Sequence, residues 1–219
     1  MANRLFQLSL AAALSALLFT ERADANLLTN SGFQTGDLSG WTTYTTANGT
    51  IGSPPIVVEF DTTGLGSSRS VQFIVGQVVA VGALQRGGGI FQNVFMPADD
   101  NLNFSMDIAS AGTDVSGNAD AGTVSLLFNG SSIAVHDFGG IAMNAIERAS
   151  FNVAIPVSAG NHEIRVEILR GFTTNDGTPR IYLDNIRALT DAQLLNTPET
   201  LPLLAIMALG LWGIRHRAT

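Results

Sequence analysis

The sequence contains no cysteine and no lysine among its 219 residues. The missing cysteine excludes a disulfide framework, a thiolate nucleophile and a cysteine-ligated zinc site. Eleven basic residues, all arginine, stand against 18 acidic ones, which gives a net charge of −7 and leaves no basic surface for nucleic acid. The three histidines are too few and too scattered for a typical zinc enzyme. These absences direct attention to the patterns of apolar and polar residues.

The N-terminus has the pattern of a secretory signal peptide. Arg4 supplies the positive charge, residues 5–19 are mostly apolar, and Ala23 and Ala25 are small residues at the positions that signal peptidase reads. The apolar run is too short for a lasting membrane span. We expect cleavage after Ala25 by signal peptidase; the alternative is a buried N-terminal helix.

A second apolar block, residues 201–214, lies near the C-terminus and carries no charge. As a helix rising about 1.5 Å per residue it would be about 21 Å long, shorter than the ~30 Å hydrocarbon core of a bilayer. Arg215 and Arg217 follow it, and such positive charges stay on the cytoplasmic side. We therefore predict transient membrane insertion rather than a permanent anchor.

The tail from residue 197 onward resembles the PEP-CTERM sorting signal of exported bacterial proteins. Pro198 and Glu199 match the start of that family's Pro-Glu-Pro motif, Thr200 departs from its third position, and residues 208–215 match its apolar and basic part. The resemblance implies a Gram-negative host and processing at the inner membrane by an exosortase-type enzyme. It also implies release to the cell surface or the extracellular matrix.

Two other C-terminal signals are alternatives. Pro198, Glu199 and Thr200 also match the middle of the Leu-Pro-x-Thr-Gly sortase signal, but Thr197 and Leu201 replace its leucine and glycine. A GPI signal ends in its apolar tail, whereas this chain ends in Arg-His-Arg-Ala-Thr. The exosortase-type signal is the interpretation we favour.

Apolar and polar residues alternate between the two ends of the chain, most regularly over residues 102–108, 151–157 and 164–168. A period of two places one side of a strand in a core and the other in water, as in antiparallel sheets. Further strands are expected at residues 56–60, 70–75, 90–95, 123–128 and 180–189. About eight to ten strands in this length imply an all-β fold, an antiparallel two-sheet β-sandwich.

Turn residues lie between these segments. Asn129-Gly130 separates two apolar runs and predicts a tight hairpin, because both turn positions require positive φ. Gly87, Gly88 and Gly89 precede the strand expected at residues 90–95, and we interpret them as a flexible approach to it.

Two segments resemble the ends of galactose-binding-like jelly rolls, which include many carbohydrate-binding modules. Residues 26–41 match an opening of the form Asn-x-x-Phe-Glu followed by Gly-Trp, and residues 181–186 match the closing strand. Residues 89–94 resemble an internal strand with an apolar-x-Gln-x-Val core. The resemblance implies a jelly roll in which the first and last strands lie close together and Trp41 fills the core.

The resulting domain organisation has four parts. A signal peptide at 1–25 precedes the jelly-roll sandwich at 26–190, and we expect the signal to be helical. A polar tether with the Pro-Glu motif follows at 191–200. The apolar C-terminal sorting signal at 201–219, also expected to be helical, ends in basic residues.

The jelly-roll resemblance implies two kinds of site. Family members often hold a structural calcium ion near the first and last strands; Asp184 and Gln34, which replaces the usual Glu, are the candidate ligands here. The alternative for Asp184 is a carboxylate hydrogen-bonded to nearby amides. Binding in the family commonly uses aromatic rings that stack on sugars, with core or turn packing as the alternative. The candidate residues are Tyr44, Phe91, Phe172 and Tyr182.

No catalytic constellation is found in the sequence. A hydrolase needs paired carboxylates, or a nucleophile with a base, and adjacent His136 and Asp137 would point to opposite faces of a strand. We therefore predict an exported, non-catalytic surface or matrix protein that associates with extracellular polysaccharide. The alternatives are a structural or adhesive surface protein with protein partners, and a secreted glycan-active hydrolase.

Overall fold

The computed structural model describes residues 26–52, 54–82, 84–113, 119–174 and 177–195. The chain divides into two compact units, and one of them, Asn26–Thr190, contains all the described strands. None of the described helices is both long and apolar enough to cross a bilayer. The expected signal peptide and sorting signal lie outside the described residues. With them lie the expected processing residues Ala23, Ala25, Pro198, Glu199, Arg215 and Arg217.

The first sheet has five antiparallel strands. Their order is β1 (Thr42–Thr45), β6 (Arg86–Met96), β11 (Gly160–Arg170), β8 (Thr123–Phe128) and β9 (Ser131–Asp137). The β8–β9 connection is the hairpin expected at Asn129-Gly130, and both residues have positive φ, 50° and 79°. That prediction is confirmed.

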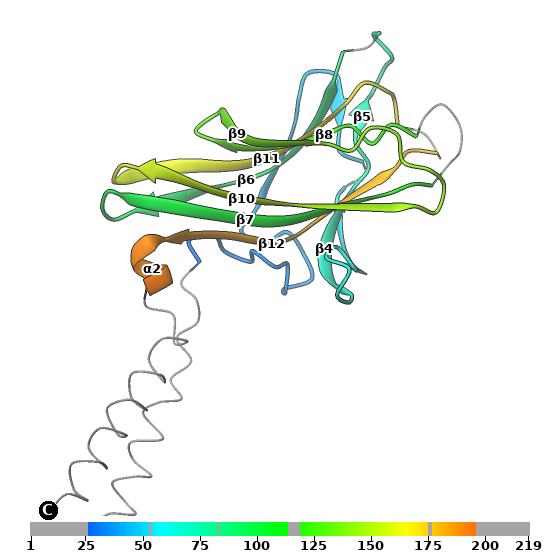
Figure 1. The fold of residues 1–219 in the computed structure, drawn as a ribbon. Coiled ribbons are helices and arrows are strands. Elements are labelled where there is room, and N and C mark those ends of the chain that lie inside the picture. Colours follow the sequence, from blue (N-terminus) through cyan, green and yellow to red (C-terminus); the bar gives the residue numbers. More distant parts are fainter. Residues whose placement is uncertain (1–25, 53, 83, 114–118, 175–176, 196–219) are drawn as a thin grey trace, which may run out of the picture. The chain divides into compact units, whose positions relative to one another are not determined.

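The second sheet also has five antiparallel strands. Their order is β10 (Ile146–Val157), β7 (Asp100–Ala111), β12 (Arg180–Thr190), β4 (Ser68–Phe73) and β3 (Ile56–Phe60). Successive strands from β6 to β8 and from β9 to β12 alternate between the two sheets (Figure 1). The antiparallel β-sandwich of jelly-roll type is confirmed.

Two smaller elements complete the described chain. A short pair joins β2 (Gly49–Thr50) to β5 (Gly76–Gln77). The first residues of the expected polar tether instead form a short helix, α2 (Asp191–Leu195), which belongs to the other compact unit.

The core lies between the two sheets and follows from the alternation. On β11, Ile164, Val166 and Ile168 are fully buried, while the residues between them face outward. Trp41 is buried against Phe33, with ring centroids 6.1 Å apart, so its expected place in the core is confirmed. The buried core residues found in the described part of the chain lie within Asn26–Thr190, so this unit has a core of its own.

The three consecutive glycines lie inside β6, not before it, which corrects the expected strand start. Gly88 pairs with Thr45 of β1, and Gly89 pairs with Glu167 of β11. A Cβ built on Gly89 would collide with the carbonyl oxygen of Val166. Glycine is therefore required because the neighbouring strand approaches too closely for any side chain.

The first segment of the unit is hydrogen-bonded to its last strand. The Asn26 side chain accepts from the Ala188 amide at 3.0 Å and donates to the Ile186 carbonyl at 3.1 Å. Buried Gln92 exchanges two hydrogen bonds with the Thr29 backbone, at 2.7 and 3.0 Å. The two ends of the jelly roll lie close together, as the resemblance implied.

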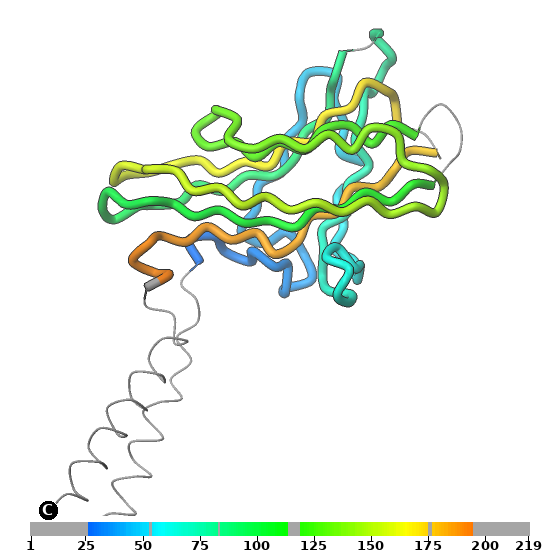
Figure 2. Tube along the Cα trace, viewed as in Figure 1, coloured from blue at the N-terminus to red at the C-terminus, as the bar shows by residue number. Residues whose placement is uncertain are grey.

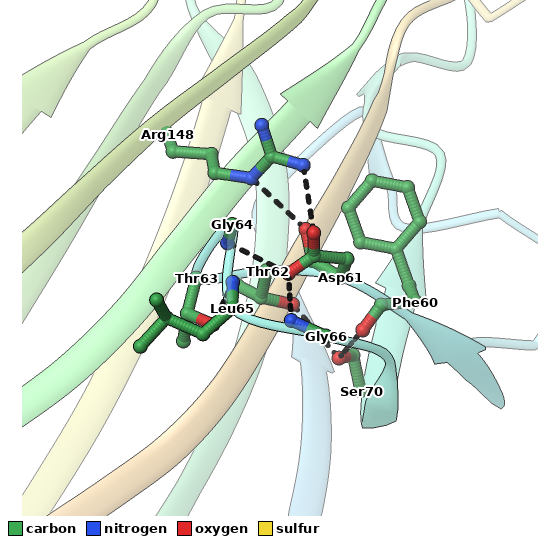
Figure 3. A network of polar contacts seen from close by, with 9 residues as sticks. All are labelled: Phe60, Asp61, Thr62, Thr63, Gly64, Leu65, Gly66, Ser70 and Arg148. Atoms are coloured by element: carbon green, nitrogen blue, oxygen red, sulfur yellow. Dashed lines mark hydrogen bonds and ion pairs between the residues drawn. The ribbon is translucent and has the colours of Figure 1, made fainter.

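The β3–β4 loop crosses the outer face of the second sheet. Arg148 on β10 donates from Nε to the Asp61 carbonyl at 3.0 Å, and its Nη2 lies 3.4 Å from the Asp61 carboxylate (Figure 3). Beneath the loop, Thr62 and Ser70 share a buried hydrogen bond of 2.8 Å. Because β3 and β10 are opposite edges of this sheet, the contact joins the end of one edge strand to the other edge strand.

The Asp61 carboxylate also folds the loop back on itself. Its Oδ1 accepts from the amides of Gly64 at 2.6 Å and Gly66 at 3.2 Å. Desolvation acts to raise the pKa of Asp61, but these amides and the Arg148 charge outweigh it and lower that pKa overall. The carboxylate therefore holds the loop as an anion.

Candidate functional site

The outer face of the first sheet carries a set of polar and aromatic side chains, of which Asn93 and Phe95 are exposed and the others are half-buried. They come from β1, β6 and β11 and alternate with buried residues such as Ile90, Gln92 and Ile164. We call this set the β6–β11 face. Its members are Tyr44, Phe91, Asn93, Phe95, Glu163, Arg165 and Glu167.

Arg165 lies at the centre of this face, over two aromatic rings. Its guanidinium carbon is 4.3 Å from the centre of the Tyr44 ring and 5.3 Å from that of Phe91. The two rings meet edge to face, with centroids 6.2 Å apart. A guanidinium over a ring face is attracted by the ring quadrupole. The Arg165 guanidinium therefore lies against both rings, and these ring faces are not open to solvent.

Two glutamates fix these groups. Arg165 Nη2 donates to Glu163 at 3.0 Å, and the Tyr44 hydroxyl donates to Glu167 at 3.1 Å. Burial, and then the Glu167 charge, raise the pKa of Tyr44 far above its usual range, so the phenol stays neutral. Burial acts to lower the pKa of Arg165, but Glu163 and Tyr44 raise it overall. The β6–β11 face therefore presents charged groups and hydrogen-bond donors whose positions are fixed by these contacts.

Phe95 is the one residue of this face that exposes most of a large ring. Its side chain is 62% exposed, although it lies on a sheet and not in a loop. Asn93, also exposed, lies between it and Phe91, and the two phenylalanines are about 13 Å apart along the strand. Sequence reasoning missed Phe95, although alternation with buried Val94 and Met96 would have placed it on the outer face.

The structure separates the four aromatic candidates. Tyr44 and Phe91 lie together on the β6–β11 face. Tyr182 is only 5% exposed, because its ring stacks on Phe60 with centroids 3.6 Å apart on the second sheet. Phe172 is exposed, but it follows the end of β11 and lies 5.5 Å from the Arg170 guanidinium. Tyr182 and Phe172 therefore do not join the other two.

Asp184 and Gln34, the candidate calcium ligands, are engaged elsewhere. The Asp184 carboxylate accepts from Ser68 and from the Asn185 amide, and the Gln34 side chain donates to the Gly32 carbonyl. Calcium binds six to eight oxygens, several of them carboxylate. In the described part of the chain, no group of three or more His, Asp or Glu side chains is placed to hold a metal ion; the calcium site stays a prediction.

Asp184 also has a carboxylate neighbour, Asp107, across the β7–β12 ladder. Burial, and to a lesser extent Asp107, raise the pKa of Asp184 despite its hydrogen bonds. A polar groove of about 360 Å³ runs beside Asp107 and Asn185 on the second sheet. Asp184 is 1% exposed and does not line that groove. The pair is therefore not presented to a substrate.

Comparison with known proteins adds fold neighbours at low similarity. No family model matches the chain, and no curated protein matches it. TmCBM61, solved in complex with beta-1,4-galactotriose, is 15% identical over 76% of this chain and 99% of its own, with a TM-score of 0.47. A xylan-binding domain from CBM 22 is 19% identical over 77% of this chain and 97% of its own, with a TM-score of 0.38.

The enzymatically active domain of tailspike protein 4 from bacteriophage CBA120 is a further neighbour. It is 16% identical over 75% of this chain and 21% of its own, with a TM-score of 0.45. Carbohydrate-binding modules are thus among the neighbours of this chain. At this level of similarity, its function has to be inferred from its own residues.

Proposed function

We propose that this chain is an exported, non-catalytic surface or matrix protein that binds extracellular polysaccharide through the β6–β11 face. The observation that carries the proposal is Phe95, a ring 62% exposed on a sheet face that also presents an amide and fixed charges. Exposed aromatic rings beside fixed polar groups suit sugars, which have apolar ring faces and polar rims.

Each group on the face has a part in such binding. The Phe95 ring packs against the apolar face of a sugar. Asn93 and Glu163 hydrogen-bond its hydroxyls, and Arg165 donates to them while resting on Tyr44. Because Arg165 is already held by Glu163 and Tyr44, little of its rotamer entropy is lost on binding.

The second sheet carries the polar groove beside Asp107 and Asn185, but the phenylalanine in the lining of that groove, Phe151, is only 6% exposed. The β3–β4 loop crosses this sheet and Tyr182 is buried on it. An extended polysaccharide therefore has its open platform on the first sheet, where the two phenylalanines of β6 lie about 13 Å apart.

The test is binding of residues 26–195 to a panel of soluble extracellular polysaccharides, by affinity electrophoresis and calorimetry. We expect Phe95→Ala and Asn93→Ala each to weaken binding at least tenfold. The matched control is Phe172→Ala, which removes an exposed phenylalanine outside the face. Absence of binding by the unaltered protein, or equal losses for Phe95→Ala and Phe172→Ala, would contradict the proposal.

Sorting is the second part of the proposal. The Pro198-Glu199 motif, the apolar block and the terminal arginines support removal of the C-terminal segment at the inner membrane after export. Intact-mass analysis of the protein released by its host should show a chain that starts at Asn26 and lacks residues 201–219. Replacing both Pro198 and Glu199 by alanine should leave the tail in place. A released species that still carries the tail would overturn this part.

An adhesive role is favoured by one feature, the long edge strand β10. Among the described strands, Ile146–Val157 pairs only with β7, so one side of this twelve-residue strand has no described sheet neighbour. Such edges pair with other chains unless charges or proline blunt them, and β10 holds Glu147, Arg148 and Pro156. Sedimentation velocity over a range of concentrations would show a dimer if β10 pairs, and a monomer if it does not.

A further inference from the structure

Five large apolar side chains are exposed around the loop that follows β5. They range from 44% to 62% exposed. We call this set the apolar tip, and its members are Val78, Val79, Val81, Leu84 and Phe172. A cluster of exposed apolar side chains on a soluble domain indicates a contact surface, whereas single ones do not.

The tip is ordered by a buried glutamine. The Gln77 side chain is 1% exposed, and its Nε2 lies 2.8–2.9 Å from the carbonyl oxygens of Gly82, Leu84 and Gly171. Its Oε1 accepts from the Val81 amide at 2.7 Å. One side chain therefore ties the loop to the segment that carries Phe172.

Asn48 fixes the start of the loop in the same way. The Val78 amide donates to the Asn48 carbonyl at 2.9 Å, and the Val79 amide donates to Asn48 Oδ1 at 3.0 Å. Asn48 Nδ2 donates to the Val79 carbonyl at 2.7 Å. These backbone groups are satisfied within the protein, which is the condition that a hydrocarbon environment imposes.

The tip is free of charge and lies far from the ends of the unit. Residues 70–85 contain no charged residue. Asn26 is hydrogen-bonded to Ala188, near the end of β12. Phe172, in contrast, lies next to the segment that precedes the start of β12. The eleven residues of β12 put about 35 Å between those ends. Figure 2 shows the loop projecting away from both ends of the unit.

A protein partner, a sugar and a lipid bilayer each require a different kind of surface for contact with the apolar tip. A protein partner needs roughly 800 Å² and about 20–30 residues on each side, more than one loop and one phenylalanine provide. A sugar needs convergent hydrogen-bonding groups, which valine and leucine lack. A lipid bilayer needs only apolar side chains on a loop whose backbone is satisfied.

We propose that the apolar tip inserts into the interfacial region of a lipid bilayer. Because the loop has no basic residue of its own, insertion depends on apolar burial and not on anionic headgroups. Because the net charge of the chain is −7, the expected binding is stronger for neutral than for anionic vesicles at low salt, and salt reduces this difference. This surface shares no residue with the β6–β11 face, so its test is independent of glycan binding.

The experiment is co-sedimentation of residues 26–195 with phosphatidylcholine vesicles, with and without phosphatidylglycerol. We expect binding to both, and a loss of at least tenfold in the partition coefficient for Val79→Asp and for Val81→Asp. The matched control is Val135→Asp on β9, where the valine is equally exposed, 59% against 61% for Val79; it should bind as the unaltered protein does. Circular dichroism verifies that each variant is folded.

Two results would overturn the inference. One is no co-sedimentation of the unaltered protein with either vesicle. The other is equal partitioning of Val79→Asp and the Val135→Asp control. Sedimentation velocity without lipid adds a further check, because concentration-dependent association that Val79→Asp abolishes would assign the tip to a second copy of the chain and also overturn it.

Discussion

Arg165 and Glu163 form a close ion pair on one face of β11, with Nη2 and Oε1 2.9 Å apart. The pair holds the guanidinium over the Tyr44 ring, with its carbon 4.3 Å from the ring centre. Both side chains are about one quarter exposed, so they remain within reach of a ligand. Arginine provides such a planar, preoriented cation because its guanidinium presents N–H donors in a rigid plane, which a positive charge alone does not do.

Arg165→Lys should therefore weaken polysaccharide binding by about tenfold, or about 1.4 kcal/mol, although the charge is kept. Lysine cannot stack flat on Tyr44 while donating to Glu163. Calorimetry with the best glycan of the panel measures the effect. The control is Arg69→Lys, whose partner Glu59 is 3.8 Å away on the other sheet; a similar loss for both variants would show that the effect is not specific to the face.

Gly89→Ala should destabilise the fold by about 3 kcal/mol, because a new Cβ has to displace the backbone of β11. Urea unfolding followed by circular dichroism measures the change. Gly140→Ala is the matched control, since nothing lies within 4 Å of its Cβ position, and it should cost less than about 0.5 kcal/mol. If the two variants unfold at the same urea concentration, the close approach of β11 to β6 is wrong.

Asp184→Asn should raise Tm at pH 7 and have little effect at pH 3. Burial raises the pKa of Asp184 in the folded protein, so the folded state resists ionisation more than the unfolded state does. The cost to stability is absent below the unfolded pKa of about 4 and appears as the pH rises through it. Asparagine removes the charge, and its amide can still pair with the Ser68 hydroxyl. Thermal unfolding from pH 3 to 7 measures the difference; a Tm gain at pH 3 as large as at pH 7 would contradict it.

Arg148→Ala should release the β3–β4 loop from the second sheet. The change removes the hydrogen bond to the Asp61 carbonyl and the ion pair to its carboxylate. We expect Tm to fall by about 2–4 °C and a protease to cleave within residues 61–67. Arg86→Ala is the control, because Arg86 donates to the carbonyl of Gln85, its neighbour in the chain. Unchanged protease resistance of Arg148→Ala would mean that other contacts hold the loop.

Much of the fold could be predicted from the sequence because the patterns that indicate strands involve residues close together in the chain. The alternation at residues 164–168 and the Asn129-Gly130 turn each depend on a few neighbouring residues. The exact start of β6 could not be predicted, since glycines at 87–89 suggest flexibility until the neighbouring strands are seen to press against them. Gln92 is a second residue whose role could not be predicted. The motif around it predicted the strand, but only the structure shows that its side chain hydrogen-bonds to the Thr29 backbone.

The candidate site was predicted in part. Tyr44 and Phe91 were named from residue type, and the register of β1, β6 and β11 brings them to Arg165. The sequence alone could not separate them from Tyr182, because an aromatic residue beside an alternating run can lie on either side of a sheet. Phe95 was missed although its alternation with Val94 and Met96 indicates the outer face.

The sequence by itself determined which residues form strands and which of their sides are apolar, because these depend on a period of two along the chain. Only the tertiary structure decided which outer face of the sandwich stays open. That choice depends on Arg148 reaching Asp61, 87 positions away in the chain, across the width of the second sheet. No local pattern encodes a contact of that range, because it exists only once all five strands of that sheet are in place.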